Sequence, residues 1–318
     1  MDELTMETMC AHLCLLTRAA WREELPTPLT RPMAHRLYAT GALCGLVLRE
    51  MDGVRPELLD RARALLTRSR DVYDLLNAYR ARDYRALLPE DELWPTELKA
   101  LGTHAPLFLF ARGNMELFAG DRIAVAGSRD IAVGTRDYAR RVGARLAAEG
   151  ITMVCGGARG VDAAAQEGLL DAGGRLILVP ATAVEGHLND GRIKRALDEG
   201  RLLILCDTLP DDSFSAQRAL ERNHIIYALG EAALVLAARN GIGGSWRGAT
   251  DCLRGGYTPV FVPAGGDIPA QKDAKADAPD GAGCRALVRL GAKVFFLNAG
   301  RSIAKQTTGA FERQTRMF

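Results

Sequence analysis

The chain has 318 residues, enough for two domains, and its 48% hydrophobic and 25% charged residues are ordinary for a globular protein. The net charge of +2 excludes a polybasic or strongly acidic protein and is compatible with a local basic groove. The seven cysteines are scattered, and the sequence has neither a signal peptide nor an apolar run of roughly 18 residues. We therefore expect a reduced, cytoplasmic protein that does not enter a membrane.

Residues 1–88 are predicted to form a small all-helical N-terminal domain, because they are rich in Leu, Ala, Arg and Glu and nearly lack runs of Val and Ile. Apolar spacing predicts helices at residues 5–24, 33–48, 56–69 and 72–83. Cys10, His12 and Cys14 lack the second ligand pair that a zinc site needs, so no metal is predicted. Residues 89–121 are predicted to be a connector that packs on the next domain, with a strand or buried segment at 107–110.

From residue 122 onward, short apolar runs alternate with helical patterns, which is typical of a parallel sheet with helices on both faces. The predicted fold class is α/β, with a Rossmann-like domain at residues 122–300. Residues 265–283 are expected to be a mobile polar loop inside it, and residues 301–318 a basic tail. Strands are expected at 123–126, 151–155, 176–179, 202–205, 233–237, 260–262 and 293–297, and helices at 135–150, 161–172, 190–198, 215–229, 247–254 and 284–290.

Three glycine-containing turns, at residues 127–129, 156–160 and 241–245, follow predicted strands. Because the carboxyl ends of parallel strands share one sheet edge, we expect the turns to converge on a crevice. Glycine lets backbone N–H groups approach an anion, and Arg129 and Arg159 add forked cations suited to phosphate. Neither a dinucleotide fingerprint nor a P-loop is present, so no cofactor is predicted. The expected anion-binding residues are Gly127, Ser128, Arg129, Gly156, Gly157, Arg159, Gly160, Gly243, Gly244 and Ser245.

The helix predicted at residues 215–229 carries a second polar group. Arg218 and Arg222 lie one turn apart, and Asn223 follows, so one face is expected to border the crevice or a partner. His224 has no assignable Ser, Cys or Asp partner, so no catalytic residue is predicted. Asp162 is expected to cap the helix that it begins. Tyr227 and Trp246 are the candidates for stacking on bases, with burial as the alternative role.

Several sequence blocks, in this order, resemble the DprA/Smf DNA-processing family over residues 88–296. They read VAGSR, CGGARGVDAAAQEGLLDAGGRLILVPA, ERNHIIYALGEAALVLAA, GGSW, PVFVPAGG and CRALVRLGA. The resemblance places Arg129 at the family's DNA pocket. It aligns Gly157, Arg159, Gly160 and Asp162 with the second block, and Arg222 and Asn223 with the third.

The chain also departs from the family pattern. His224 stands where the family has a second arginine, and Gln166 replaces a histidine. A C-terminal winged helix is not expected after residue 318. Arg192 and Lys194 are the nearest basic residues to a lysine that the family carries downstream of the third strand. With Arg222 and Asn223, they complete the set of residues expected to bind DNA phosphates.

The resemblance implies a homodimer without catalytic activity that binds single-stranded DNA. It also implies that the protein hands this DNA to the recombinase RecA in transformation or recombination. Two alternatives stay open. The fold is shared with nucleotide sensors and with phosphoribohydrolases, although residues 241–247 lack the carboxylate that those hydrolases use. The crevice can also be vestigial in a protein that acts as a scaffold for partners.

Overall fold

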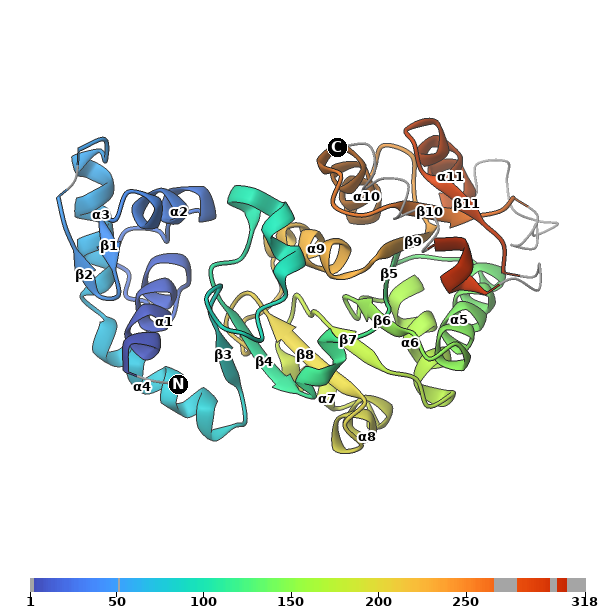
Figure 1. Ribbon diagram of the computed structural model, residues 1–318, viewed down its shortest axis with the longest axis horizontal. Helices are drawn as coiled ribbons and strands as arrows, with labels where there is room; N and C mark the ends of the chain where they lie inside the picture. The colour runs from blue at the N-terminus through green and yellow to red at the C-terminus, as the bar shows by residue number, and fades with distance from the viewer. Residues whose placement is uncertain (1–2, 51, 266–278, 298–301, 308–318) are drawn as a thin grey trace. The chain divides into compact units, whose positions relative to one another are not determined.

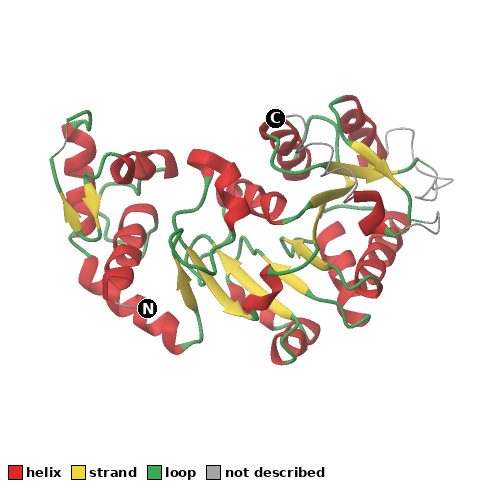
Figure 2. Cartoon of the chain, viewed as in Figure 1, coloured by secondary structure: helices red, strands yellow, loops and turns green. Residues whose placement is uncertain are grey.

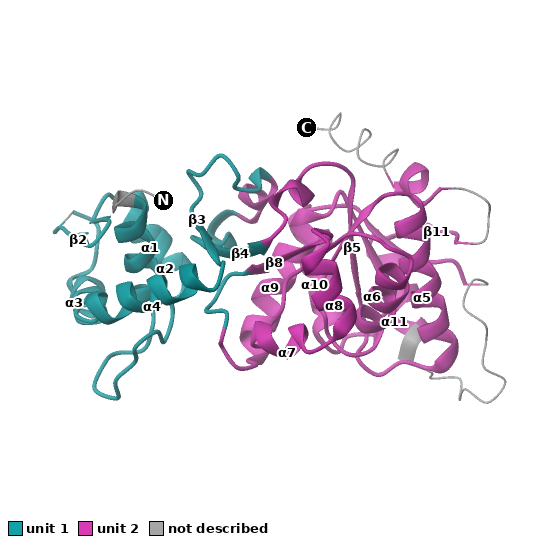
Figure 3. Cartoon of the chain, turned by 90° about the horizontal axis from the view of Figure 1, so that it is seen from below, with its two compact units in different colours: residues 1–96, 102–112, 206–210 teal, residues 97–101, 113–205, 211–318 magenta. Residues whose placement is uncertain are grey.

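The computed structural model describes residues 3–50, 52–265, 279–297 and 302–307, which form helices, strands and loops as coloured in Figure 2. The chain divides into two compact units (Figure 3). Unit 1 holds residues 1–96, 102–112 and 206–210, and unit 2 holds residues 97–101, 113–205 and 211–318. Residues 89–121 are thus shared between the units, and two 3₁₀ segments lie there: η1 (Thr96–His104) and η2 (Met115–Phe118).

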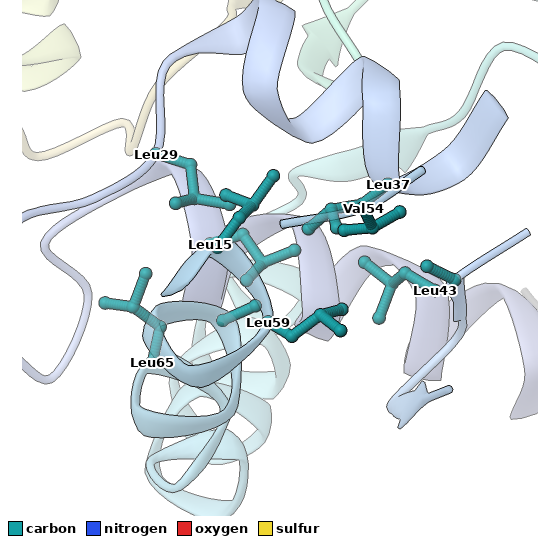
Figure 4. Close-up of a cluster of buried hydrophobic side chains, with 10 residues drawn as sticks. Leu15, Leu29, Leu37, Leu43, Val54, Leu59 and Leu65 are labelled. Carbon is teal, nitrogen blue, oxygen red and sulfur yellow. The ribbon is translucent and has the colours of Figure 1, made fainter. Parts of the chain in front are cut away.

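The described part of unit 1 is built mainly from four helices: α1 (Glu3–Leu16), α2 (Arg31–Ala39), α3 (Pro56–Leu66) and α4 (Ser69–Ala81). Apolar residues of α1, α2 and α3 meet in one leucine-rich cluster together with residues of the loops between these helices (Figure 4). Leu15, Leu37 and Leu65 in this cluster are completely buried. The strand β3 (Arg85–Leu87) pairs with β4 (Leu109–Gly113) in antiparallel register, with Ala86 opposite Phe110.

Two of the helices predicted in unit 1 end at least eight residues earlier than expected. The prediction of one helix over residues 33–48 is wrong, because α2 stops at Ala39 and residues 43–48 form the antiparallel pair β1 (Leu43–Cys44) and β2 (Val47–Leu48). The backbone φ angles of Gly41 (71°) and Gly45 (57°) are incompatible with a helix. The first helix stops at Leu16 rather than at residue 24, and Ala20 beyond it has a φ of 48°.

Unit 2 contains a parallel sheet with the order β11-β10-β9-β5-β6-β7-β8. All residues of β9 are buried, as expected for a strand covered on both faces. The chain runs outward from β5 through β8 and then returns to place β9 on the other side of β5. The strand order therefore reverses between β5 and β9. The strands are β5 (Arg122–Gly127), β6 (Thr152–Cys155), β7 (Leu176–Leu178), β8 (Leu202–Cys206), β9 (Ala232–Ala237), β10 (Val260–Pro263) and β11 (Lys293–Phe295).

Helices flank this sheet, so the predicted Rossmann-like fold is confirmed (Figure 1). They are α5 (Val133–Ala148), α6 (Val161–Asp171), α7 (Val184–Leu188), α8 (Gly191–Asp198), α9 (Ala216–Leu229), α10 (Gly244–Gly255) and α11 (Pro279–Arg289). The short helix α7 was not predicted, and α10 and α11 begin three and five residues earlier than expected. Within the described ranges, no helix is long and apolar enough to cross a membrane.

Residues 302–307 pack against the end of α5. The Glu149 carboxylate accepts hydrogen bonds from the Ile303 N–H (3.0 Å), the Ala304 N–H (3.2 Å) and the Ser302 hydroxyl (2.7 Å). Most of the predicted mobile loop and of the predicted basic tail lies outside the described residues.

Glycine allows α5 and α6 to pack in unusually close contact. A Cβ atom on Gly143 of α5 would overlap the carbonyl oxygen of Ala165 in α6. In the same way, a Cβ on Gly168 of α6 would overlap the Arg140 carbonyl oxygen. Because backbone atoms occupy both positions, no side-chain rotation can relieve the overlap. The middle of α6 is therefore held against α5 by backbone packing.

We expect Gly143→Ala to lower the free energy of unfolding by about 2–3 kcal/mol, because the helices must separate to admit one methyl group. Gly186→Ala is the matched control. Gly186 lies in α7, and a Cβ there meets nothing within 4 Å, so this change should be neutral or stabilising by up to about 1 kcal/mol. Urea denaturation of the two variants measures the difference. Equal effects would contradict the close packing of α5 and α6.

Candidate nucleic-acid interface

The first two glycine turns lie in direct backbone contact. The Val161 N–H, at the start of α6, donates to the Ser128 carbonyl oxygen at 3.1 Å. A Cβ on Gly160 would overlap that same oxygen, and a Cβ on Gly127 would overlap the Val161 side chain. The turns can approach this closely only because both positions are glycine. The structure thus brings residues 127–129 and 156–160 together at the carboxyl edge of the sheet.

The third turn reaches the same edge from β9. The Ser128 N–H donates to the Ala237 carbonyl oxygen at 2.9 Å, which ties the end of β5 to the end of β9. Residues 239–242 then form a small bridged loop, and Gly243, with a φ of 90°, leads into α10. Because the strand order reverses between β5 and β9, this is the point where open α/β sheets leave a crevice.

A cavity of about 780 Å³ occupies this place, and we call it the switch-point cavity. It opens to solvent and is lined by residues at the ends of β5 and β9, on α9 and in α10. Eight of the residues expected to bind an anion line it: Gly127, Ser128, Arg129, Arg222, Asn223, Gly243, Gly244 and Ser245. The volume lies within the range of pockets that hold small molecules.

The exposed rim of the cavity is positively charged. Arginines 129, 239, 247 and 254 line it, together with Asp130 and Asp251. Two of these arginines contact the aspartates loosely: Arg239 lies 3.5 Å from Asp130, and Arg247 lies 4.0 Å from Asp251. The excess of guanidinium groups suits an anionic ligand. Arg239, Arg247 and Arg254 were not predicted, because each is an isolated arginine in its stretch of sequence.

A buried arginine lies deeper in the cavity wall. Arg222, on α9, is only 5% exposed, and a Cβ on Gly156 would overlap its guanidinium. The glycine at position 156 therefore makes room for a side chain that arrives from a helix 66 positions later in the sequence. The face predicted to border the crevice does so in part, because Arg222 and Asn223 line the cavity, whereas Arg218 pairs with Asp212 outside the cavity lining.

Asp162 organises the second glycine turn rather than only capping its own helix. Its Oδ2 atom accepts hydrogen bonds from the Gly156 N–H at 3.1 Å and the Ala158 N–H at 3.4 Å. Burial raises the pKa of Asp162 from 3.8 to about 6, and the positive charge of Arg222 opposes that shift. The carboxylate is 5% exposed and lines the cavity, so it belongs to both the turn and the site.

An aromatic ring that was not predicted lies at the mouth of the cavity. Phe214 precedes α9, is 47% exposed, and has the Arg129 guanidinium 5.0 Å from its ring centroid. Of the two candidates for stacking, Tyr227 is buried and Trp246 is half-buried, and both line the cavity. A phenylalanine isolated in a polar loop gives no periodic signal, so only the three-dimensional structure identifies it.

The remaining predicted residues lie outside the cavity lining. Arg159 is exposed on the second turn beside Gly160, and a Cβ on Gly157 would clash with the His187 ring. Arg192, on α8, pairs with Asp171 at 2.7 Å and Glu167 at 3.4 Å, both on α6. Lys194 is exposed on α8. The structure therefore does not bring Arg192 and Lys194 to the three turns.

Asn223 and His224 connect α9 to α10. The Asn223 side-chain amide donates to the Gly244 carbonyl oxygen at 3.4 Å. The Nε2 atom of His224 lies 3.4 Å from an Asp251 carboxylate oxygen, a partner that sequence spacing did not reveal. Among the described residues, no cluster of three or more His, Cys, Asp or Glu is arranged to hold a metal ion.

Asp162→Asn should change how stability depends on pH. The folded pKa of about 6 exceeds the ordinary 3.8, so the folded state holds the proton more tightly, and stability falls as pH rises through this interval. Asparagine keeps an acceptor oxygen for the two N–H groups but does not titrate. From about pH 5 to pH 7.5, we expect the variant to gain roughly 1 kcal/mol relative to wild type in urea denaturation. A stability difference between the variant and the wild-type protein that stays constant with pH would rule out the raised pKa of Asp162.

The chain was compared with known proteins by sequence. The sequence model described as DNA recombination-mediator protein A matches residues 85–306. A protein of Mycobacterium tuberculosis named DNA processing protein DprA is 28% identical over 250 residues, which cover 73% of this chain and 60% of that protein. The chain therefore spans about three fifths of the length of the curated relatives it matches.

Solved structures show the same fold. The X-ray structure of DprA from Streptococcus pneumoniae has a TM-score of 0.68 at 21% identity, covering 96% of this chain and 99% of that one. DprA from Helicobacter pylori, for which a single-stranded DNA binding mode is described, has a TM-score of 0.54 at 22% identity, covering 74% and 97%. The family match covers well over half of the sequence and includes all three glycine turns. This protein therefore belongs to the DNA recombination-mediator protein A family of DNA-processing proteins, DprA.

Proposed function

We propose that this protein binds single-stranded DNA in the switch-point cavity, without catalysing a reaction on it. The observation that carries the proposal is the pair at the mouth, where Arg129 lies over the exposed ring of Phe214. A guanidinium can bind a phosphate oxygen while an aromatic face stacks on a base. Basic grooves with aromatic platforms are the usual means of binding single strands.

The rim arginines supply the contacts to the strand's backbone. Arg129, Arg239, Arg247 and Arg254 come from the β5 turn, the β9 turn and α10, so they surround the cavity rather than form one flat patch. Each phosphate that they neutralise releases counterions, so affinity should fall steeply with salt.

The shape of the site favours a single strand over a duplex. Duplex grooves are read by an inserted helix or strand pair, whereas this site is a concave cavity of about 780 Å³ between α9 and α10. Unpaired nucleotides can bend into such a cavity, and the paired bases of a duplex cannot. The single-stranded DNA binding described for the H. pylori relative supports the same ligand.

The family description as a recombination mediator supports a further role. We infer that the protein works as a homodimer and delivers the bound strand to a RecA-type recombinase. Light scattering over a range of concentrations tests the dimer.

A second ligand class, a mononucleotide, is favoured by one observation. The cavity volume of about 780 Å³ is that of a small-molecule pocket. A mononucleotide that bound tightly, with no binding of DNA at low salt, would make the protein a nucleotide sensor.

Arg129→Ala should weaken binding of an oligothymidylate of about 20 nucleotides at least tenfold, or about 1.4 kcal/mol, because it removes one charge-assisted phosphate contact. Fluorescence anisotropy from about 50 to 200 mM salt measures the affinity. The slope of log affinity against log salt should decrease in magnitude by about 0.7, the value for one phosphate of a single strand. A duplex of equal length should bind more weakly to the wild-type protein.

Arg192→Ala is the matched control, because Arg192 is an exposed arginine outside the cavity lining. Removing the Arg192 side chain should change the affinity for the oligothymidylate less than about twofold, because this arginine pairs with Asp171 and Glu167 at the surface and lies outside the cavity. If Arg192→Ala weakened binding as much as Arg129→Ala, the proposed site would be wrong.

A further inference from the structure

One carboxylate oxygen at the edge of the switch-point cavity has two basic neighbours. The Oδ2 atom of Asp251 lies 3.4 Å from Nε2 of His224 and 4.0 Å from Nε of Arg247. Asp251 and Arg247 lie one turn apart on α10, whereas His224 reaches the carboxylate from α9. Because both groups approach the same oxygen atom, the charge on the histidine affects how strongly the carboxylate attracts the arginine.

The three side chains differ in their access to a ligand. Their exposed fractions are 15% for His224, 30% for Asp251 and 67% for Arg247. Asp251 and Arg247 line the cavity, and His224 lies outside the lining. A phosphate in the cavity can therefore reach Arg247, while His224 acts on it only through Asp251. Because His224 is largely buried, salt screens its charge less than it screens a surface pair.

The elements packed against α9 present one carboxylate to it, that of Asp251. Burial raises the pKa of the thiols and of the Tyr257 phenol among these groups, so they stay uncharged near neutral pH. The Tyr257 ring packs edge-on against the imidazole, with 5.9 Å between the ring centroids. The ionisable side chains of these elements are Arg247, Asp251, Cys252 and Arg254 on α10, Tyr257 after it, Arg122 on β5 and Cys155 on β6, and those of α9 itself are Arg218, Glu221, Arg222, His224 and Tyr227.

The protonation state of His224 sets the net charge of this group. A neutral imidazole leaves the negative charge of Asp251 to Arg247, so the two cancel at the rim. A protonated imidazole neutralises Asp251 instead, and the positive charge of Arg247 then acts on the ligand. An ordinary histidine changes between these states near about pH 6.5.

We infer that His224 and Asp251 form a pH-sensitive control of the contact between Arg247 and the bound strand, so that DNA binds more tightly when His224 is protonated. This inference rests on the proposed function and adds regulation to the same site. The direction follows from charge, because the protonated site carries one more positive charge toward the phosphates. A permanent positive charge at position 224 would remove the control.

Arg247→Gln tests the inference by removing the group that His224 controls. Each protein is titrated with an oligothymidylate by fluorescence anisotropy at constant ionic strength. Between about pH 7.5 and about pH 5.5, we expect the affinity of the wild-type protein to rise at least about threefold. Arg247→Gln should lose most of this rise.

Arg239→Gln is the matched control. Arg239 also lines the cavity and lies 3.5 Å from an aspartate, Asp130, but no histidine contacts Asp130 among the described residues. This variant should bind more weakly than the wild-type protein at both pH values and keep the full rise. Asp162 also lines the cavity and has a pKa of about 6, but it is present in every protein compared, so differences between variants isolate the contribution of His224.

His224→Arg tests the same control from the other side. This variant holds the positive charge at every pH of the titration. At about pH 7.5 it should bind the oligothymidylate within about twofold of the wild-type affinity at about pH 5.5, and it should gain less than the wild-type protein on acidification.

The outcomes separate this inference from the proposed function. If the wild-type protein binds no oligothymidylate at either pH in low salt, the proposed function fails. If it binds but its affinity does not change with pH, or if Arg247→Gln keeps the full rise, DNA binding stands and the control by His224 is overturned.

A second measurement needs no variant. The chain has five histidines, and NMR follows the titration of the His224 ring with and without the oligothymidylate. Because linkage is reciprocal, a strand that binds the protonated form more tightly must move the midpoint of this titration to higher pH, by about 0.5 for a threefold preference. An unchanged midpoint in the bound protein would overturn the inference even if the variants failed to fold.

Discussion

The switch-point cavity depends on a buried pair of charged groups that contact the second glycine turn. The Arg222 guanidinium lies against Gly156, and the Asp162 carboxylate accepts a hydrogen bond from the Gly156 N–H. Burying a cation is costly unless a negative charge lies nearby, and burying a carboxylate is costly unless N–H groups and a cation face it. Here each group offsets the burial cost of the other. Because Arg222 comes from α9 and Asp162 from α6, the arrangement joins the two halves of the sheet at the place where the cavity forms.

This arrangement separates positive charge that is structural from positive charge that is available to a ligand. Arg222 balances Asp162 inside the wall, whereas Arg129 lies outside it, over Phe214. Arg192 shows the opposite case, since it is exposed but already pairs with Asp171 and Glu167. A count of arginines near a glycine turn therefore overestimates the positive charge that a bound phosphate would meet. An arginine is available to a phosphate only where no acidic side chain already neutralises it.

The sequence predicts the parts of this molecule that follow from repeating physical rules. Buried parallel strands read as apolar runs, and the carboxyl ends of such strands share an edge, so the meeting of Gly127 with Gly160 was foreseeable. The prediction of helix ends failed where a single glycine interrupts the apolar spacing of a helix. Gly41 and Gly45 ended a helix that apolar spacing extended to residue 48.

The site also contains residues that no local pattern marks. Arg239, Arg254 and Phe214 reach the cavity because the strand order reverses, and that reversal is a property of the whole sheet. Arg222 was expected on a helix face that borders the crevice, but its burial depends on the space that Gly156 leaves for its guanidinium, which only the structure shows.

The return of β9 to the side of β5 also has a consequence for how the protein is made. Ser128 bonds to Ala237, so the cavity's two walls are separated by more than a hundred residues of chain. Contacts between distant segments form late, and a chain emerging from the ribosome folds its earlier part first. A nascent chain that ends before β9 would already carry both arginine-bearing glycine turns but would lack the wall that encloses a ligand. The switch-point cavity is thus completed only after most of the polypeptide has been synthesised.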